Sequence, residues 1–248
     1  MRKAKKKKRV VVFDFDGTLT HKPPKGKSLF VAIDEGVLSP EGQAAQQKLF
    51  NHYIAKAQTG TMTAGEDEAW LLQSIENYIL YGVTPEKARA ALAAVVLRPG
   101  VIECLEMLRQ EQIPVAIVSY GIAPLIELVL ERHNIAVPGL IHKVYAARLT
   151  AHPERGYTGY DRSTVVLQST KGDWSRHFAD LHDVPHADIL AVGDTGGDRR
   201  LGHLKKNRLA IAGDAAHAKE ISPFMGRVIV TDDFHPVTAW LRSKIGLI

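Results

Sequence analysis

Two aspartates stand at the end of an apolar run near the N-terminus. In RVVVFDFDGTLT (9–20), Asp14 and Asp16 follow four β-branched or aromatic residues and precede a Gly-Thr turn. The four residues Val10–Phe13 predict a strand that is buried on both faces, as strands of parallel sheets are. Carboxylates are costly within such a strand. We therefore expect Asp14 and Asp16 at its carboxyl end, where open α/β sheets bind ligands.

Two further apolar runs end in the same manner. In VAIVSYG (115–121) the apolar run ends at Ser119. In ILAVGDTGGD (189–198) it ends just before Asp194, and Asp198 follows four residues later. The carboxyl ends of parallel strands lie along one edge of a sheet, so these side chains should meet Asp14 and Asp16 in one crevice. The sequence therefore predicts a single polar site.

Four carboxylates in one crevice repel each other, and a bound hard cation removes that repulsion. Mg²⁺ is the common ion where the substrate is a phosphate, and it keeps several waters while using one or two protein carboxylates. A carboxylate can attack phosphorus to form an aspartyl-phosphate, while a second carboxyl group acts as general acid and then as base. The spacing of Asp14 and Asp16 suits these two roles.

Groups that can hold a phosphate accompany the acids. Backbone N–H groups and hydroxyls follow the first two runs, at Gly17, Thr18, Ser119, Tyr120 and Gly121,. Lys171 of STKGDW lies at the predicted start of a helix, where it can place a cation against developing negative charge,. These residues predict a phosphate-binding site beside the acids.

Taken in order, DFDGTLT, VSYG, Lys171 and GDTGGD resemble the four motifs of the haloacid dehalogenase-like superfamily of hydrolases. The resemblance covers 9–20 and about 98–230. It implies a Rossmann-like core with Asp14 as nucleophile and Asp16 as general acid and base. It also implies that Ser119 binds the phosphoryl group and that Lys171 steadies the nucleophile and the phosphate.

The same resemblance implies a magnesium site. Asp194 would hold Mg²⁺, and Asp14 and the backbone carbonyl of Asp16 would complete the protein ligands. Asp198 would support the site from close by. The founding dehalogenases lack an acid two residues after the nucleophile, so the presence of Asp16 resembles the phosphate-transferring members instead.

The elements that must position these residues follow an α/β pattern. From about residue 98, strands alternate with helices, which predicts a Rossmann-like doubly wound parallel sheet. Between Thr20 and Leu97 the pattern is helical. Helices are expected from Pro40, after the N-cap Ser39, to just before Gly60, then over about 66–81 and from Thr84 onward,. This insert resembles the cap of phosphoserine phosphatase-like members, which closes over the site and selects the substrate.

The expected domains follow from this division. A catalytic core comprises 1–20 and 98–248, with 1–9 as a basic tail, and 21–97 forms a small helical cap domain. Within the core, HKVYAARL (142–149) and STVVLQS (163–169) are expected to be extended segments that could pair. A helix is also expected after GGDRRLGHL (196–204), before the strand RLAIAG.

Charge and composition limit the partners. The net charge of the 248 residues is +5, but 2–9 hold seven Lys or Arg, which leaves −2 for the rest of the chain. Nucleic acid is therefore expected as a partner only through 2–9. No apolar run approaches the roughly 18 residues of a membrane span. The single cysteine, Cys104, is expected to be a buried thiol, and its isolation agrees with a cytoplasmic protein,.

These observations predict a Mg²⁺-dependent phosphatase that hydrolyses a small phosphorylated metabolite through an aspartyl-phosphate. Two alternatives stay open. A phosphotransferase or mutase would use the same residues, and a nucleic-acid-associated protein would bind through its basic N-terminal tail. The identity of the metabolite does not follow from the sequence.

Overall fold

The computed structural model describes residues 7–59 and 61–247 of the chain. Its strands are β1 (Val10–Phe13), β2 (Val115–Ile122), β3 (Lys143–His152), β4 (Gly156–Asp161), β5 (Ile189–Gly193), β6 (Arg208–Ala212) and β7 (Arg227–Val230). Its α-helices are α1 (Leu29–Gly36), α2 (Pro40–Thr59), α3 (Ala64–Leu80), α4 (Pro85–Ala91), α5 (Val101–Gln110), α6 (Ala123–Arg132), α7 (Lys171–Leu181), α8 (Ala215–Ile221) and α9 (His235–Ile245).

The strands form one sheet in the order β4-β3-β2-β1-β5-β6-β7. All neighbouring pairs are parallel except β3 with β4. The chain runs from β1 outward through β2 and β3 and then returns to β5 on the other side of β1. Asp14 follows β1 at this reversal of the strand order, which is the position where open α/β sheets bind ligands,.

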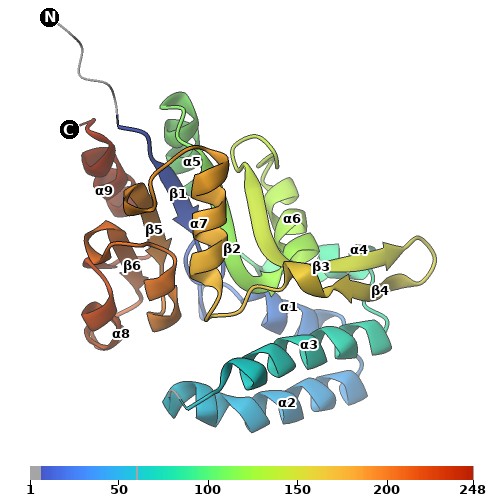
Figure 1. Ribbon diagram of the computed structural model, residues 1–248. Coiled ribbons are helices and arrows are strands. Elements are labelled where there is room, and N and C mark those ends of the chain that lie inside the picture. The colour runs from blue at the N-terminus through green and yellow to red at the C-terminus, as the bar shows by residue number, and fades with distance from the viewer. Residues whose placement is uncertain (1–6, 60, 248) are drawn as a thin grey trace, which may run out of the picture.

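Helices cover both faces of this sheet (Figure 1). Val11 and Phe13 of β1 belong to the core that includes residues of α5, α6 and α9. Val10 and Val12 pack on the opposite face with Phe178 of α7. A strand buried on both faces needs apolar side chains at every position, which is why β1 shows no alternation. The predicted doubly wound parallel core is confirmed.

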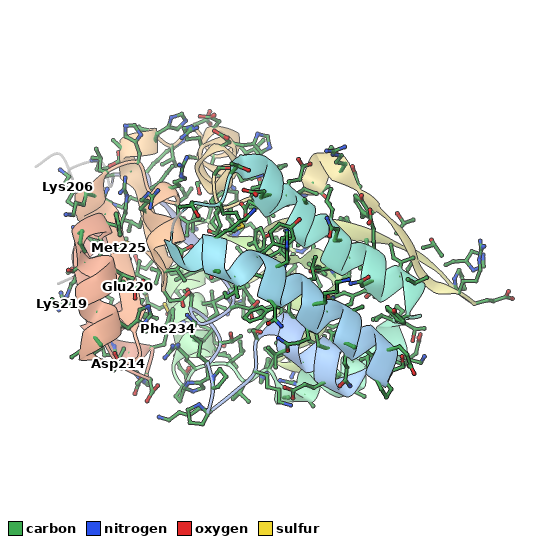
Figure 2. All side chains as sticks on the ribbon, turned by 90° about the horizontal axis from the view of Figure 1, so that it is seen from below. Lys206, Asp214, Lys219, Glu220, Met225 and Phe234 are labelled. Atoms are coloured by element: carbon green, nitrogen blue, oxygen red, sulfur yellow. The ribbon has the colours of Figure 1, made fainter. Side chains whose placement is uncertain are left out.

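The helices α1, α2 and α3 lie at the carboxyl edge of the sheet, below it in Figure 1, and α4 packs against α1 and α6. Seen from below in Figure 2, α2 and α3 lie side by side across this edge, with α8 and its labelled Lys219 to one side. Ser28, Thr63 and Thr84 cap α1, α3 and α4 by accepting hydrogen bonds from backbone N–H groups of the first turn,.

The helices predicted within this insert are present. The structure adds α1, which the sequence analysis missed although Ser28 precedes an apolar run. At the two ends of the insert, Thr20 and Leu97 form an isolated antiparallel bridge, so its entry and exit lie together. The division of the chain into a core and a cap domain at these points stays a prediction.

The prediction that STVVLQS (163–169) is an extended segment able to pair with 142–149 is wrong. β3 pairs instead with β4, through a tight connection after His152. Asp161 then accepts hydrogen bonds from the N–H and hydroxyl of Ser163, and a 3₁₀ turn follows at Arg162–Thr164. The nearer segment pairs first because it closes a shorter loop, and the Asp161 turn directs the chain away from the sheet.

The prediction of a helix after GGDRRLGHL is also wrong. Between β5 and β6 the chain forms only the 3₁₀ segments Gly196–Arg200 and Lys205–Asn207. The short connection turns back on itself because the side chain of Asp198 accepts hydrogen bonds from the N–H groups of Asp194 and Thr195. This turn returns a carboxylate to the end of β5.

Residues 7–9 of the basic tail lie in the described part of the chain. Lys7 forms an ion pair of 2.5 Å with Asp188, and Lys8 lies 3.9 Å from Asp183. The predicted binding role of 2–9 concerns mostly residues outside the described part of the chain. Cys104 is buried, as predicted. Among the described residues, no helix is both long and apolar enough to cross a membrane.

Candidate active site

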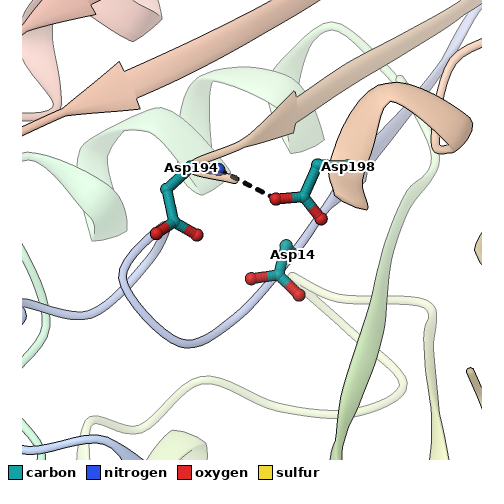
Figure 3. A group of neighbouring side chains, drawn as sticks. All are labelled: Asp14, Asp194 and Asp198. Carbon is teal, nitrogen blue, oxygen red and sulfur yellow. Dashed lines mark hydrogen bonds between the residues drawn. The ribbon is translucent and has the colours of Figure 1, made fainter. Parts of the chain in front are cut away.

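Asp14, Asp194 and Asp198 form a buried acidic cluster at the carboxyl edge of the sheet (Figure 3). Each offers a carboxylate oxygen, and these oxygens all lie within 4.8 Å of one another. Asp14 follows β1 and Asp194 follows β5. The two strands are neighbours in parallel register, which brings their carboxyl ends together as the sequence predicts.

Asp198 is positioned by the turn that follows β5. Its Oδ2 accepts hydrogen bonds from the N–H of Asp194 at 3.0 Å and from the N–H and hydroxyl of Thr195, both at 2.9 Å. Gly193 makes room for this arrangement, because a Cβ at Gly193 would overlap the side chain of Asp198. The Gly-Asp-Thr sequence therefore builds the site through its backbone.

Lys171 connects two members of the cluster. Its Nζ lies 2.8 Å from Asp14 Oδ1 and 2.7 Å from Asp198 Oδ1, and its side chain is buried at the start of α7. Burial by itself would lower the pKa of this ammonium, but the two carboxylates outweigh that effect and raise the pKa,. Lys171 is therefore held in its charged form.

The acids of the cluster differ in their pKa values. Burial raises the pKa of Asp14, opposed by Lys171 and reinforced by the charges of Asp198 and Asp194. For Asp198, burial also raises the pKa, but Lys171 and the backbone N–H groups together lower it below its ordinary value. Asp194 has a raised pKa, mainly through burial. Ionisation of all three acids would therefore place more negative charge here than Lys171 can neutralise, and the raised pKa values of Asp14 and Asp194 reflect that cost,.

The carboxylate of Asp16 points elsewhere. Its Oδ1 accepts a hydrogen bond of 2.9 Å from the backbone N–H of Leu29, the first residue of α1. Burial raises the pKa of Asp16 to about 7, and the hydrogen bond from Leu29 opposes this rise. A carboxyl group with such a pKa is partly protonated near neutrality, as a general acid must be.

Ser119 and its neighbours lie in the second half of β2, beyond the residues that pair with β1. Ser119 is buried, and its Oγ accepts a hydrogen bond of 3.1 Å from Gly121 N–H. The Ser119 proton can therefore be donated to another group. The hydroxyl of Tyr120 donates to the carbonyl of Asp67 in α3 at 2.7 Å, so this side chain joins the core to the helical insert.

The Gly17-Thr18 turn closes the other side of the cluster. Thr18 Oγ1 donates to Asp194 Oδ1 at 3.1 Å. The Gly17 N–H donates to Thr20 Oγ1 at 3.1 Å, and the Thr18 N–H donates to the carbonyl of Phe15 at 3.2 Å. Because these N–H groups and that of Gly121 already have partners, phosphate binding by them stays a prediction.

Three residues that the sequence analysis missed also contact this region. The first is Arg98, whose buried guanidinium donates to the carbonyls of Gly17 at 2.9 Å and Thr231 at 3.0 Å. Arg98 therefore holds the Gly17-Thr18 turn, which contacts Asp194, in place. Only its place directly before Pro99-Gly100 distinguished it in the sequence, and this indicated a turn.

The second is Asp67, near the start of α3. Its Oδ2 accepts a hydrogen bond of 3.1 Å from the N–H of Gln168, in the loop before Lys171. Burial raises the pKa of Asp67, and the charge of Lys171 is near enough to oppose that rise. The insert therefore brings a carboxylate close to the cluster.

The third is Lys22, which forms an ion pair with Asp194 Oδ2. Burial by itself would lower its pKa, but Asp194, Asp14 and Asp198 raise it. Neither Asp67 nor Lys22 carries a signal in the sequence, because both reach the site through loops and helices whose placement depends on packing.

The donor set fits a hard divalent cation. The cluster offers carboxylate oxygens, which Mg²⁺ prefers, in a buried position,. Asp194 Oδ2 is buried, and among the described residues its partner is the ammonium of Lys22, with which it forms an ion pair. A buried carboxylate oxygen in this condition is suited to a metal ion.

A protein-family model described as haloacid dehalogenase-like hydrolase matches 11–203. Solved structures are similar along nearly the whole chain. A substrate-bound phosphoserine phosphatase has 17% sequence identity and a TM-score of 0.68, over 95% of this chain and 99% of that one. Cytosolic 5'-nucleotidase IIIB bound to cytidine has 20% identity and a TM-score of 0.70, over 96% and 86%.

A structure described as a phospho-aspartyl intermediate analogue of phosphoserine phosphatase has 18% identity and a TM-score of 0.67, over 95% of this chain and 99% of that one. No significant match was found among curated proteins. At these identities the structural matches support the fold, and the family model covers most of the chain, including all four motifs. The chain belongs to the family of haloacid dehalogenase-like hydrolases.

Proposed function

We propose that this protein is a Mg²⁺-dependent phosphatase that hydrolyses a small phosphomonoester through an aspartyl-phosphate on Asp14. The observation that carries the proposal is the contact of Lys171 Nζ with Asp14 Oδ1 at 2.8 Å, beside Asp194 and Asp198. This places a fixed cation and a candidate nucleophile together at the switch point of the sheet.

The metal would be held by Asp14, by the backbone carbonyl of Asp16 and by Asp194, with Asp198 in support. Bound Mg²⁺ supplies positive charge against the phosphate dianion and against the charge that develops on its oxygens. Thr18 and Asp198 orient this site through their hydrogen bonds, with Thr18 donating to Asp194 and Asp198 accepting from the Asp194 N–H.

In the first step, a carboxylate oxygen of Asp14 attacks phosphorus, and the bond from phosphorus to the ester oxygen breaks. Asp16 gives its proton to the departing oxygen, which leaves as an alcohol. The raised pKa of Asp16, about 7, favours the protonated carboxyl that this step needs. Lys171 neutralises charge on Asp14 and on the transferring group,.

In the second step, water attacks the phosphorus of the aspartyl-phosphate. Asp16, now ionised, takes a proton from this water, and the bond between phosphorus and Asp14 breaks to release phosphate. Ser119 is placed to donate its hydroxyl proton to a phosphoryl oxygen in both steps, because its oxygen already accepts from Gly121. Asp14 and Asp16 return to their starting states.

The position of the helical insert supports the proposal that the substrate is small. Asp16 contacts α1 through Leu29, and Tyr120 contacts α3 through Asp67, so the insert lies directly over the site. A cap of this kind excludes water and selects what enters. The similar structures carry the printed names phosphoserine phosphatase and 5'-nucleotidase, so amino-acid phosphates and nucleoside monophosphates are the first esters to test.

The test is phosphate release from a panel of esters, including phosphoserine, nucleoside monophosphates and sugar phosphates. Each ester is tested with Mg²⁺ and with EDTA, using the wild-type protein and Asp14→Asn. Release that needs both Mg²⁺ and Asp14 is the expected result. Full activity of folded Asp14→Asn would refute Asp14 as nucleophile, and phosphate transfer to a second substrate would identify a phosphotransferase or mutase instead.

A further inference from the structure

Lys22 lies in the loop between the first motif and α1, and it reaches into the acidic cluster. Its ammonium pairs with Asp194 Oδ2. The side chain of Asp194 is 2% exposed, whereas that of Lys22 is 49% exposed. One partner of this ion pair is therefore fixed inside the protein, and the other is a flexible side chain that enters from the surface.

The path of Lys22 runs across the Gly17 turn. Gly17 has a φ of +78°, and a Cβ on it would overlap Cε of Lys22 and lie 2.6 Å from Asp194 Oδ2. Glycine thus leaves the space through which Lys22 reaches Asp194. The contact depends on the motif itself, because a side chain at position 17 would close this path.

The Lys22 ammonium lies near all three carboxylates of the acidic cluster. Asp14 and Asp198 also lie close enough to attract it, and these are the residues that group with Asp194 as a cation site. Lys171 already occupies Asp14 Oδ1 and Asp198 Oδ1. The oxygen that Lys22 contacts, Asp194 Oδ2, has no hydrogen bond from other described residues and is thus a natural metal-binding atom.

We propose that Lys22 is an active-site residue that exchanges partners when a divalent cation binds. Without the metal, its ammonium neutralises Asp194. The cation displaces it, because both need the same carboxylate oxygen, and the freed ammonium then pairs with the phosphoryl group of the substrate at the mouth of the site. Lys22 thereby weakens metal binding and strengthens phosphate binding. This inference rests on the proposed metal-dependent function.

Binding measurements on the complete protein test the exchange. Isothermal titration calorimetry gives the affinity for Mg²⁺, and then for inorganic phosphate at saturating Mg²⁺. Lys22→Met should bind Mg²⁺ about tenfold more tightly than the wild type, because it lacks the competing ammonium. It should bind phosphate at least about fivefold more weakly. The matched control is Lys25→Met, because Lys25 lies in the same loop and pairs with Asp232.

Chemical labelling of the wild-type protein gives a second test that needs no variant. Lysine acetylation by an active ester, followed by peptide mass spectrometry, is compared with and without Mg²⁺. Lys22 should react faster once Mg²⁺ releases it from Asp194. Lys25, whose side chain is 54% exposed, should react equally under both conditions.

The outcomes separate this inference from the proposed function. If wild type and Lys22→Met bind Mg²⁺ with equal affinity, or if Mg²⁺ leaves the labelling of Lys22 unchanged, the exchange is refuted while the metal site stands. Equal phosphate affinity in the two proteins would refute the second half of the exchange. If neither protein binds Mg²⁺, both the inference and the proposed metal dependence fail.

Discussion

Asp16 and Leu29 are joined by a hydrogen bond of 2.9 Å from the backbone N–H of Leu29 to Oδ1 of Asp16. Leu29 is the first residue of α1, so a helix N-terminus of the insert contacts the candidate general acid. Because this N–H favours the ionised form of Asp16, the position of α1 and the proton affinity of Asp16 are linked,.

Leu29→Pro tests this link. Proline is tolerated at the first position of a helix, and it removes the N–H that Asp16 accepts. The pKa of Asp16 should rise, and the alkaline limb of the kcat/KM profile should move upward by about one pH unit. Leu29 is also buried, so Leu29→Ala, which loses packing but keeps the N–H, is the control. Equal profiles for the two variants would contradict the link.

Lys171 should be essential for the stability of the metal-free protein as well as for turnover. Lys171→Met removes the ammonium shared by Asp14 and Asp198 and leaves buried carboxylates without a counter-charge. Its free energy of unfolding in EDTA should fall by about 3 to 5 kcal/mol, measured by urea titration. Mg²⁺ should recover part of this loss. The exposed Lys87, changed to Met, should alter stability by less than about 0.5 kcal/mol,.

The metal-free protein should lose stability as the pH rises from about 4 to 7. Burial raises the pKa of Asp16 from 3.8 to about 7, so in this window the folded protein binds more protons than the unfolded chain. The free energy of unfolding must then decrease with increasing pH. Allowing for the partial exposure of Asp16, we expect a loss of about 2 kcal/mol between pH 5 and 7.5 in EDTA.

Asp16→Asn provides the control for this pH dependence. The variant cannot titrate at position 16, so its stability should vary less with pH than that of the wild type. An identical pH dependence in the two proteins would show that other groups are responsible. Asp14 is the first of these to examine, because burial raises its pKa as well.

Tyr120 should matter through the contact between core and insert. Its hydroxyl donates to the Asp67 carbonyl at 2.7 Å, so Tyr120→Phe removes one hydrogen bond and should lower stability by about 1 kcal/mol,. If this contact holds the insert over the site, KM should rise more than kcat falls. Tyr160→Phe removes a longer, exposed hydrogen bond of 3.4 Å to Glu76. This control should leave stability, KM and kcat unchanged.

Much of the candidate site could be predicted because its residues follow strands. The carboxyl ends of parallel strands share an edge, so Asp14 and Asp194 had to meet once β1 and β5 were neighbours,. The local pattern also determined most helices of the insert, because capping residues such as Thr63 and Thr84 act within one turn,. Motif order and strand position together carried these predictions.

The remaining features depended on tertiary packing. β3 selected β4 as its partner, and the chain after β5 formed 3₁₀ turns, because short loops and the Asp198 hydrogen bonds outweighed the periodic pattern. The direction of the Asp16 carboxylate toward Leu29 and the approach of Lys22 to Asp194 join residues whose elements meet only in the folded chain. The sequence by itself determined which groups gather at the sheet edge, because strand ends are local features. Only the tertiary structure decided which partner each group takes, because long side chains and loops settle by packing against distant segments.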